Sequence, residues 1–282
     1  MKKFNNIEKI KKSIVSTIII SMISISAFTQ SFSPYNEIGL MLGSSYYLGE
    51  LNKTHFNDVQ IAGGLFFRKN IDRRFAYKIE AILGYLNGDE RDNKNDSISQ
   101  DRYLHFKSPL YEFSTQIEFN FLPYEVGNPL YSWTPFVFSG ISVFQFNPMA
   151  ESPNGNWVNL QELGTEGQGT PQFPERKKYS LIQFSVPMGG GIKFAISNST
   201  TIMLEYGMRK TFTDYLDDIS TTYPGKNIMQ QYGDLATYMS DPTDNHVMGE
   251  QRGEEENNDW YSFAFVTISI KLNTNSETCF YY

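Results

Sequence analysis

Hydrophobic and polar residues alternate with a period of two along most of the chain after residue 30. In Tyr111–Phe121, apolar side chains occupy every second position, and polar ones such as Glu112 and Gln116 fill the positions between. Successive side chains of a β-strand point to opposite faces, so this pattern predicts a strand with one apolar and one polar face. Three further segments show the same alternation: residues 75–85, 182–194 and 202–208.

Four weaker segments complete a set of eight: residues 36–48, 58–69, 134–146 and 259–272. In 134–146 both rows are apolar, so its two faces stay unassigned. Most of the eight approach the length that a tilted strand needs to cross a membrane, about 9–11 residues. Beyond the N-terminal region no stretch approaches eighteen apolar residues, which excludes a helical membrane protein.

The connections between these segments alternate in length. Long links fall at residues 49–57, 87–104, 147–178 and 213–258, and short ones fall at 70–74, 123–132 and 197–199. Such alternation is typical of outer-membrane barrels. We therefore predict an all-β fold, an eight-stranded up-and-down antiparallel transmembrane β-barrel with short periplasmic turns and long extracellular loops. An even strand number places both termini in the periplasm.

Aromatic residues near the strand ends also favour a membrane barrel, because Trp and Tyr gather at membrane interfaces. They are Tyr46, Tyr47, Tyr85, Tyr111, Tyr124, Trp133, Trp260 and Tyr261. A soluble lipocalin-like barrel also has eight strands, but it keeps its apolar row inside, around a ligand. Here glycines and ionised residues share the row opposite the apolar one. This distribution favours the membrane barrel.

The N-terminus reads as an export signal. A lysine-rich start is followed by Ser13–Phe28, sixteen residues without a charge. This is typical of a secretory signal peptide, although an uncleaved membrane anchor is the alternative. We divide the chain into a signal peptide (1–30), an outer-membrane β-barrel (31–272) and a periplasmic C-terminal tail (273–282). The expected location is the cell outer membrane.

Ionised residues on the inward row balance in sign. The five acids and five bases are Glu37, Glu80, Glu112, Glu118, Glu205, Arg68, Lys78, Lys193, Arg209 and Lys271. An eight-stranded barrel is just wide enough for side chains to fill it. Unpaired charges there would cost several kcal/mol each, so we expect an ion-pair network that plugs the lumen. A wide pore is not expected.

The composition gives little indication of an enzyme. The 24 lysines and arginines are outnumbered by 31 acidic residues, so no basic surface for nucleic acid is expected. One cysteine and three histidines cannot form a disulfide framework or a Cys/His zinc cluster. Asp92–Asp96 faintly resembles a calcium loop, but it lacks the central glycine and reads as a solvated turn. We expect no catalytic residue, cofactor, metal or small-molecule substrate; outer-membrane lipid is the expected surrounding.

The segment 213–258 carries ten acids and two bases. Such a charge run is usually solvated, although it can also dock a basic partner or a divalent ion. Asp217–Asp218 could form a cation site, but capping the turn after Thr213 is the favoured role.

The only cysteine, Cys279, lies in a polar tail after the last alternating segment. About seven extended residues would carry it roughly 23 Å beyond the barrel. A lone cysteine in an exported protein suggests an intermolecular disulfide or a free thiol. We hypothesise that Cys279 forms a disulfide with a periplasmic partner.

Several longer strings resemble the PorG-like outer-membrane barrel family of the type IX secretion system. They are Gly39–Lys53, Ser108–Val126, Leu163–Thr170, Arg209–Pro224 and Gln251-Arg-Gly followed by Asp259-Trp-Tyr. The resemblance runs from about Tyr35 to Leu272. It implies an integral outer-membrane protein that associates with the periplasmic PorK–PorN ring, with no cofactor or catalytic residue.

Two classes of function follow. The leading one is a structural outer-membrane component of the secretion system, which tethers PorK-like and PorN-like ring proteins and, in some relatives, supports gliding motility. The alternative is a narrow outer-membrane channel or a lipid-modifying outer-membrane enzyme. A channel needs an unbalanced lumen, and an enzyme needs converging histidines or paired acids.

Overall fold

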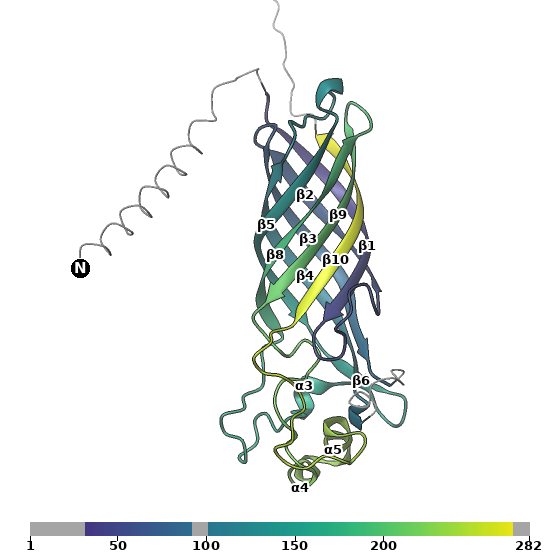
Figure 1. Cartoon of the computed structure of the whole chain (residues 1–282), viewed down its shortest axis with the longest axis vertical. Coiled ribbons are helices and arrows are strands. Elements are labelled where there is room, and N and C mark those ends of the chain that lie inside the picture. The colour runs from purple at the N-terminus through teal and green to yellow at the C-terminus, as the bar shows by residue number, and fades with distance from the viewer. Residues whose placement is uncertain (1–31, 92–100, 273–282) are drawn as a thin grey trace, which may run out of the picture. The chain divides into compact units, whose positions relative to one another are not determined.

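The computed structural model describes residues 32–91 and 101–272, in which eight long strands form a closed antiparallel barrel (Figure 1). The barrel strands are β1 (Tyr35–Leu48), β2 (Gln60–Asn70), β3 (Phe75–Asp89), β4 (His105–Asn120), β5 (Trp133–Phe146), β8 (Ile182–Ala195), β9 (Thr200–Thr211) and β10 (Trp260–Leu272). Each pairs with its neighbours in chain order, and β1 pairs with β10 to close the barrel. The predicted eight-stranded antiparallel barrel is confirmed.

Barrel closure brings the first and last strands side by side. Asn36 pairs with Leu272 at one end, and Leu48 pairs with Trp260 at the other. Both strands therefore reach the same rim, which we call the terminal rim; it includes the short links 71–74, 121–132 and 196–199. The opposite end is the loop rim.

Two strands extend past their alternating segments. β3 and β4 pair as far as Asp89 with His105, several residues beyond Tyr85 and Tyr111. In this extension the pattern is reversed: Leu86, Phe106 and Leu110 are buried on the inner face, and polar residues such as Asn87 and Lys107 face outward. The expected signal peptide, the 92–96 turn and the 273–282 tail lie outside the described residues.

The long links fold into a cap over the loop rim, formed by residues 49–59, 101–104, 147–181 and 212–259. Figure 1 shows its small elements beyond one end of the barrel. They are β6 (Met149–Glu151), β7 (Trp157–Asn159), α3 (Leu160–Leu163), α4 (Lys226–Met229), η2 (Gln230–Tyr232) and α5 (Asp234–Ser240), while η1 (Pro129–Tyr131) lies at the terminal rim. Leu160, Ile219 and Met239 are buried within the cap. No helix in the described part of the chain is long and apolar enough to cross a membrane.

The barrel is apolar outside and polar inside. Leu42, Ile61 and Phe184 are 70%, 76% and 69% exposed on the outer surface. An apolar belt of this extent belongs in hydrocarbon, because soluble proteins rarely expose such large patches. The chain is thus an outer-membrane type of barrel, and the apolar exterior excludes the lipocalin alternative.

Strand β5 resolves the segment whose faces the sequence leaves unassigned. Phe136 and Phe144 point into the barrel and are 1% exposed, whereas Val137 and Ile141 face outward at 43% and 65%. Large aromatic side chains therefore help to fill the lumen.

The sequence predicts that eight aromatic residues lie at the membrane interface, and this prediction is wrong for four of them. Tyr85, Tyr111 and Trp133 are 42–51% exposed near the strand ends, as a girdle requires. Four tyrosines are instead buried at 1% exposure or less: Tyr46, Tyr47, Tyr124 and Tyr261. Loop segments cover some and the lumen encloses others, so nearness to a strand end does not by itself place a side chain at the lipid interface.

Candidate functional site

The lumen holds a connected ion-pair network centred on Glu118 of β4. The Glu118 carboxylate lies 2.9 Å from Arg68 Nε, 3.6 Å from Lys78 Nζ and 2.5 Å from Lys193 Nζ. All four side chains are fully buried. They meet because β2, β3, β4 and β8 each place an inward residue at a similar height in the barrel.

The network continues through the other predicted residues. Lys78 Nζ contacts Glu205 at 2.8 Å and Glu80 at 3.0 Å. Arg209 joins Glu80 to Glu112, with both contacts at 3.3 Å. Arg68 also reaches Glu37 at 3.4 Å. Nine of the ten residues predicted for the lumen network are therefore linked.

Lys271 is the exception. Its Nζ donates to the Val126 carbonyl at 3.3 Å and lies 4.4 Å from the centre of the Tyr35 ring. The lysine stands opposite Glu37 across the β1–β10 pairing, but Glu37 is already engaged by Arg68, by Ser269 Oγ at 2.6 Å and by Asn70 Nδ2 at 2.7 Å. Its inclusion in the network is wrong, because the side chain extends toward the terminal rim.

Neutral groups and aromatic rings complete the lumen. Tyr261 donates to Glu112 at 2.6 Å, and Lys193 Nζ lies 4.4 Å from the centre of the Phe136 ring. Buried charges are tolerated when they are paired and their remaining lone pairs find donors. These contacts hold the lumen side chains in fixed positions, so the side chains fill the barrel interior as a plug.

A second buried ionic cluster lies in the cap. Arg252 Nη1 contacts Glu166 Oε1 at 3.0 Å and donates to the Asp218 carbonyl at 2.6 Å. Tyr179 donates to the Asp218 carboxylate at 2.6 Å, and Thr165 donates to it as well. Burial raises the pKa of Asp218 to about 6, although the Arg252 charge opposes the rise.

This cluster corrects the expectation that segment 213–258 is simply solvated. Glu254, Glu255 and Glu256 are exposed, but Arg252 is 2% exposed and bonds to Glu166 of the link 147–181 and to Asp218 of its own link. Arg252 anchors the segment in the cap because two buried acids, Glu166 and Asp218, lie within ion-pair distance of its guanidinium. Composition alone could not reveal that pairing.

A third cluster consists of acids only, beside the loop rim. Glu50, Asp217 and Asp259 place one carboxylate oxygen each within 4.8 Å of the others. The Tyr47 hydroxyl lies 2.5 Å from Asp217 Oδ2 and 2.9 Å from Asp259 Oδ1, and it has a single proton to donate. Asp217 Oδ1 accepts the Ile219 N–H at 2.9 Å, so the predicted turn-capping role describes only one of its two oxygens.

Electrostatics in this acidic cluster disfavour charge. Burial raises the pKa of Asp217 well above its ordinary range, and the Glu50 charge adds to the rise. Burial and the Asp217 charge act in the same way on the pKa of Asp259. Burial also raises the pKa of Asp214 to about 8, with the Glu50 charge as the next cause.

The sequence did not single out Glu50, Asp259 or Asp214. A signal for the first two existed, because Glu50 follows β1 by two residues and Asp259 directly precedes β10, and these strand ends pair when the barrel closes. For Asp217 the sequence favours turn capping over cation binding.

The three histidines do not converge. His55 Nδ1 lies 3.0 Å from the Tyr46 hydroxyl, and His105 Nε2 accepts the Glu151 N–H at 2.9 Å. His246 stacks on Tyr223 with ring centres 4.0 Å apart. Within residues 32–91 and 101–272 none of them forms a serine–histidine–aspartate chain.

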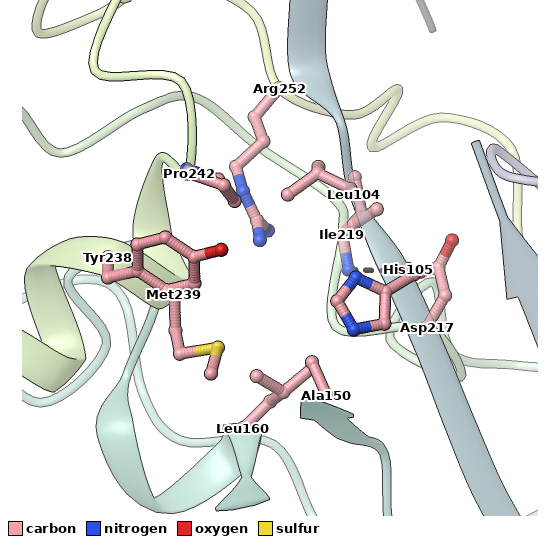
Figure 2. A pocket seen from close by; sticks show the side chains of 10 residues that line it. All are labelled: Leu104, His105, Ala150, Leu160, Asp217, Ile219, Tyr238, Met239, Pro242 and Arg252. Carbon is pink, nitrogen blue, oxygen red and sulfur yellow. Dashed lines mark hydrogen bonds between the residues drawn. The ribbon is translucent and has the colours of Figure 1, made fainter. Parts of the chain in front are cut away.

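Figure 2 shows a small cavity inside the cap, with Tyr238 and Met239 of α5 on one side and His105 of β4 on another. Its volume is about 10 Å³, room for roughly one water molecule. Asp217 forms part of its wall. A cavity of this size cannot hold an organic substrate.

Solved structures similar to the chain have low identity to it. The attachment invasion locus protein Ail of Yersinia pestis, in complex with a heparin analogue, is 8% identical, with 86% of this chain and 100% of Ail covered and a TM-score of 0.42. The N-terminal β-barrel domain of Pseudomonas aeruginosa OprF is 8% identical, with coverages of 85% and 100% and a TM-score of 0.36. Neisserial surface protein A is 8% identical, with coverages of 85% and 97% and a TM-score of 0.40.

Among curated proteins no sequence match was found. A protein-family model does match, over residues 13–164, which is more than half of the 282-residue chain. The matched part includes β1 to β5 and six of the nine linked residues of the lumen network. The chain therefore belongs to the family described as a domain of unknown function, DUF6089.

Proposed function

We propose that this protein is a structural outer-membrane component of the type IX secretion system, which anchors the periplasmic PorK–PorN ring to the membrane. The observation on which the proposal depends most is the filled lumen. Glu118 and its three bases occupy the barrel interior, so the barrel is suited to holding partners at its surfaces rather than to conducting solutes. The sequence strings that resemble PorG-like barrels supply the identity of the partner.

The terminal rim is the face assigned to the ring in this proposal, with both termini in the periplasm. Its longest link, 121–132, carries Leu130 at 84% exposure on η1. Arg73 and Glu125 form an ion pair of 2.9 Å that holds this link against the β2–β3 turn. The proposal assigns this exposed apolar side chain to the contact with a ring protein. Cys279, the proposed disulfide partner, lies outside the described residues.

Co-purification tests the proposal. A tagged barrel extracted from outer membrane in mild detergent should bring down PorK-like and PorN-like proteins, identified by mass spectrometry. Leu130→Asp should reduce their recovery severalfold, because it places a charge in the apolar contact. Val247→Asp is the matched control, since Val247 is also strongly exposed, at 70%, but lies in the cap.

Recovery of no ring protein with the wild-type barrel would overturn the anchoring role. Equal losses in both variants would show that the terminal rim is not the contact surface. Cys279→Ser forms a separate arm: non-reducing gels with a thiol-blocking reagent should lose a shifted band if the tail is cross-linked to a partner.

Conductance measurements distinguish the anchoring function from the alternative of a narrow channel. We expect no stable open-channel steps from the pure protein in planar bilayers, because paired side chains fill the lumen. Reproducible steps would contradict the plug and favour a narrow channel.

A further inference from the structure

A cavity at the loop rim borders both solvent and the membrane-facing wall of the barrel. Leu48 and Trp260, which pair where β1 and β10 reach this rim, form its apolar part. Both side chains belong to the outward rows of their strands. We call this space the rim cavity; it has a volume of about 730 Å³ and is open to solvent, and its polar lining includes Lys53, Asn257 and Asn258. The rim cavity is therefore suited to a ligand that has both apolar and polar parts.

Two lysines beside the rim cavity carry charges that are available to a ligand. Lys53 lines the cavity, and Lys210 Nζ lies 6.0 Å from the centre of the Trp260 ring. Both lysines are exposed, and neither forms an ion pair within the described part of the chain. The partly buried acid of the lining, Glu50, already accepts the Glu254 N–H at 3.2 Å. Basic side chains at a membrane surface attract anionic lipid headgroups.

A shallow groove of about 360 Å³ lies on the outer wall of the barrel, further from the loop rim. It crosses β8, β9 and β10, where Gly190 and Ala264 present little or no side chain to lipid. Leu204 and Val266, which are 53% and 56% exposed, form its apolar walls. We call it the outer groove. Strand β10 reaches both features, because Trp260 of the rim cavity and Ala264 stand roughly 13 Å apart along the strand.

The link 49–59 reaches both features on the outside of the barrel. Besides Lys53, it carries Phe56, whose ring centre lies 5.7 Å from that of Tyr206, a residue of the outer groove. Phe56 also lies 5.2 Å from Tyr46, and its ring is 63% exposed on the membrane-facing wall. Its backbone φ of 60° is unusual for a bulky side chain. Such strained residues gather at ligand contacts, so the link is suited to holding a molecule that spans the cavity and the groove.

We propose that the rim cavity and the outer groove together bind one phosphorylated glycolipid of the outer leaflet. Lys53 and Lys210 bind its phosphate. Asn257 and Asn258 bind its sugar hydroxyls, and the outer groove takes one acyl chain. A soluble sugar phosphate would leave the groove empty, and an uncharged lipid would leave both lysines without a partner. The proposal goes beyond the ring-anchoring role and shares with it only the orientation, in which the loop rim faces the outer leaflet.

Native mass spectrometry tests this site on the barrel purified from outer membrane in mild detergent, with lipid A as the probe. The wild type should retain one lipid A, and it should retain phosphatidylethanolamine, which has a phosphate but no sugar, more weakly. Lys53→Gln combined with Lys210→Gln should weaken lipid A binding by about tenfold or more, because both headgroup contacts are lost. Lys69→Gln is the control, an exposed base on the outward row of β2 near the terminal rim, and it should bind like the wild type.

A second pair of variants tests the outer groove. Ala264→Phe should fill the groove and weaken lipid A binding severalfold, whereas Ile268→Phe, on the same outward row but outside the groove, should not. Heat-modifiable migration on gels reports that each variant is folded, and the lysine variants keep the test decisive if Ala264→Phe does not fold.

The proposal is overturned if the wild type retains no lipid A, or if it binds phosphatidylethanolamine as tightly. It is also overturned if either the lysine variant or a folded Ala264→Phe binds lipid A as tightly as its control. A lipid-free dimer of barrels that Ala264→Phe disrupts would assign the groove to a second copy of the chain and would likewise contradict the proposal.

Discussion

The barrel lumen and the acidic cluster at the loop rim both bury carboxylates, but within the described residues only those of the lumen form ion pairs with bases. In the lumen, Glu118 contacts Arg68, Lys78 and Lys193 within 3.6 Å. At the loop rim, Asp217 and Asp259 share the single proton of Tyr47. Burial is nearly complete in both regions. The difference shows that charge balance, rather than burial, separates a network of ionised side chains from a cluster in which ionisation is disfavoured.

Opposite responses to neutralisation should follow. A lumen carboxylate stabilises its bases, so removing its charge leaves buried cations uncompensated. A loop-rim carboxylate without a base is costly to ionise in the folded cap, so removing its charge relieves repulsion.

The largest effect is expected from Glu118→Gln. It leaves Arg68, Lys78 and Lys193 without their shared partner, and we expect a loss of about 3–5 kcal/mol in the free energy of unfolding. The midpoint of urea unfolding, followed by heat-modifiable migration in lipid vesicles, measures this. Glu125→Gln is the matched control, because its partly exposed pair with Arg73 should contribute less than about 1 kcal/mol. Equal midpoints for the two variants would show that the lumen network is not stabilising.

Asp217→Asn should act in the other direction. In chelator, which removes stray metal ions, we expect it to stabilise the cap against opening, because burial raises the pKa of Asp217 and a neutral amide avoids the cost of burying a charge. Hydrogen exchange or limited proteolysis of segment 212–259 reports the free energy of opening. A variant that opens more readily than the wild type in chelator would remove the contrast with the lumen.

The pH dependence of the cap has a definite sign. The pKa of Asp214 is raised to about 8 and that of Asp218 to about 6, so the folded cap retains protons that the open cap releases above about pH 4. In chelator the free energy of opening should fall as pH rises from about 4 to 8 and then level off. Proteolysis of segment 212–259 at pH 5 and pH 8 checks this, and faster cleavage at pH 5 would contradict it.

The smallest effect on the barrel is expected from deleting residues 234–256. The deletion removes Arg252 and so loosens the cap around Glu166 and Asp218. The eight strands keep all of their neighbours, so the barrel should still insert and migrate as a heat-modifiable species. Loss of insertion would show that the cap is needed to form the barrel.

The sequence by itself determined the architecture and most of the lumen. Period-two alternation specifies which side chains face lipid, and the alternation of link lengths specifies the topology. Because Glu80, Glu112 and Lys193 occupy inward positions of predicted strands, their placement required no knowledge of distances. Where both rows are apolar, as in β5, the same rule could not assign the faces.

Tertiary structure decided what no local pattern encodes. The links that form the cap have no periodicity, so the burial of Arg252 beside Glu166 depends on contacts between residues 86 positions apart in the chain. The approach of Glu50 to Asp259 depends on the closure of β1 against β10, the longest-range pairing in the barrel. Strand geometry is a local property that repeats along the sequence, whereas a cluster of side chains is fixed only by how separate links pack together.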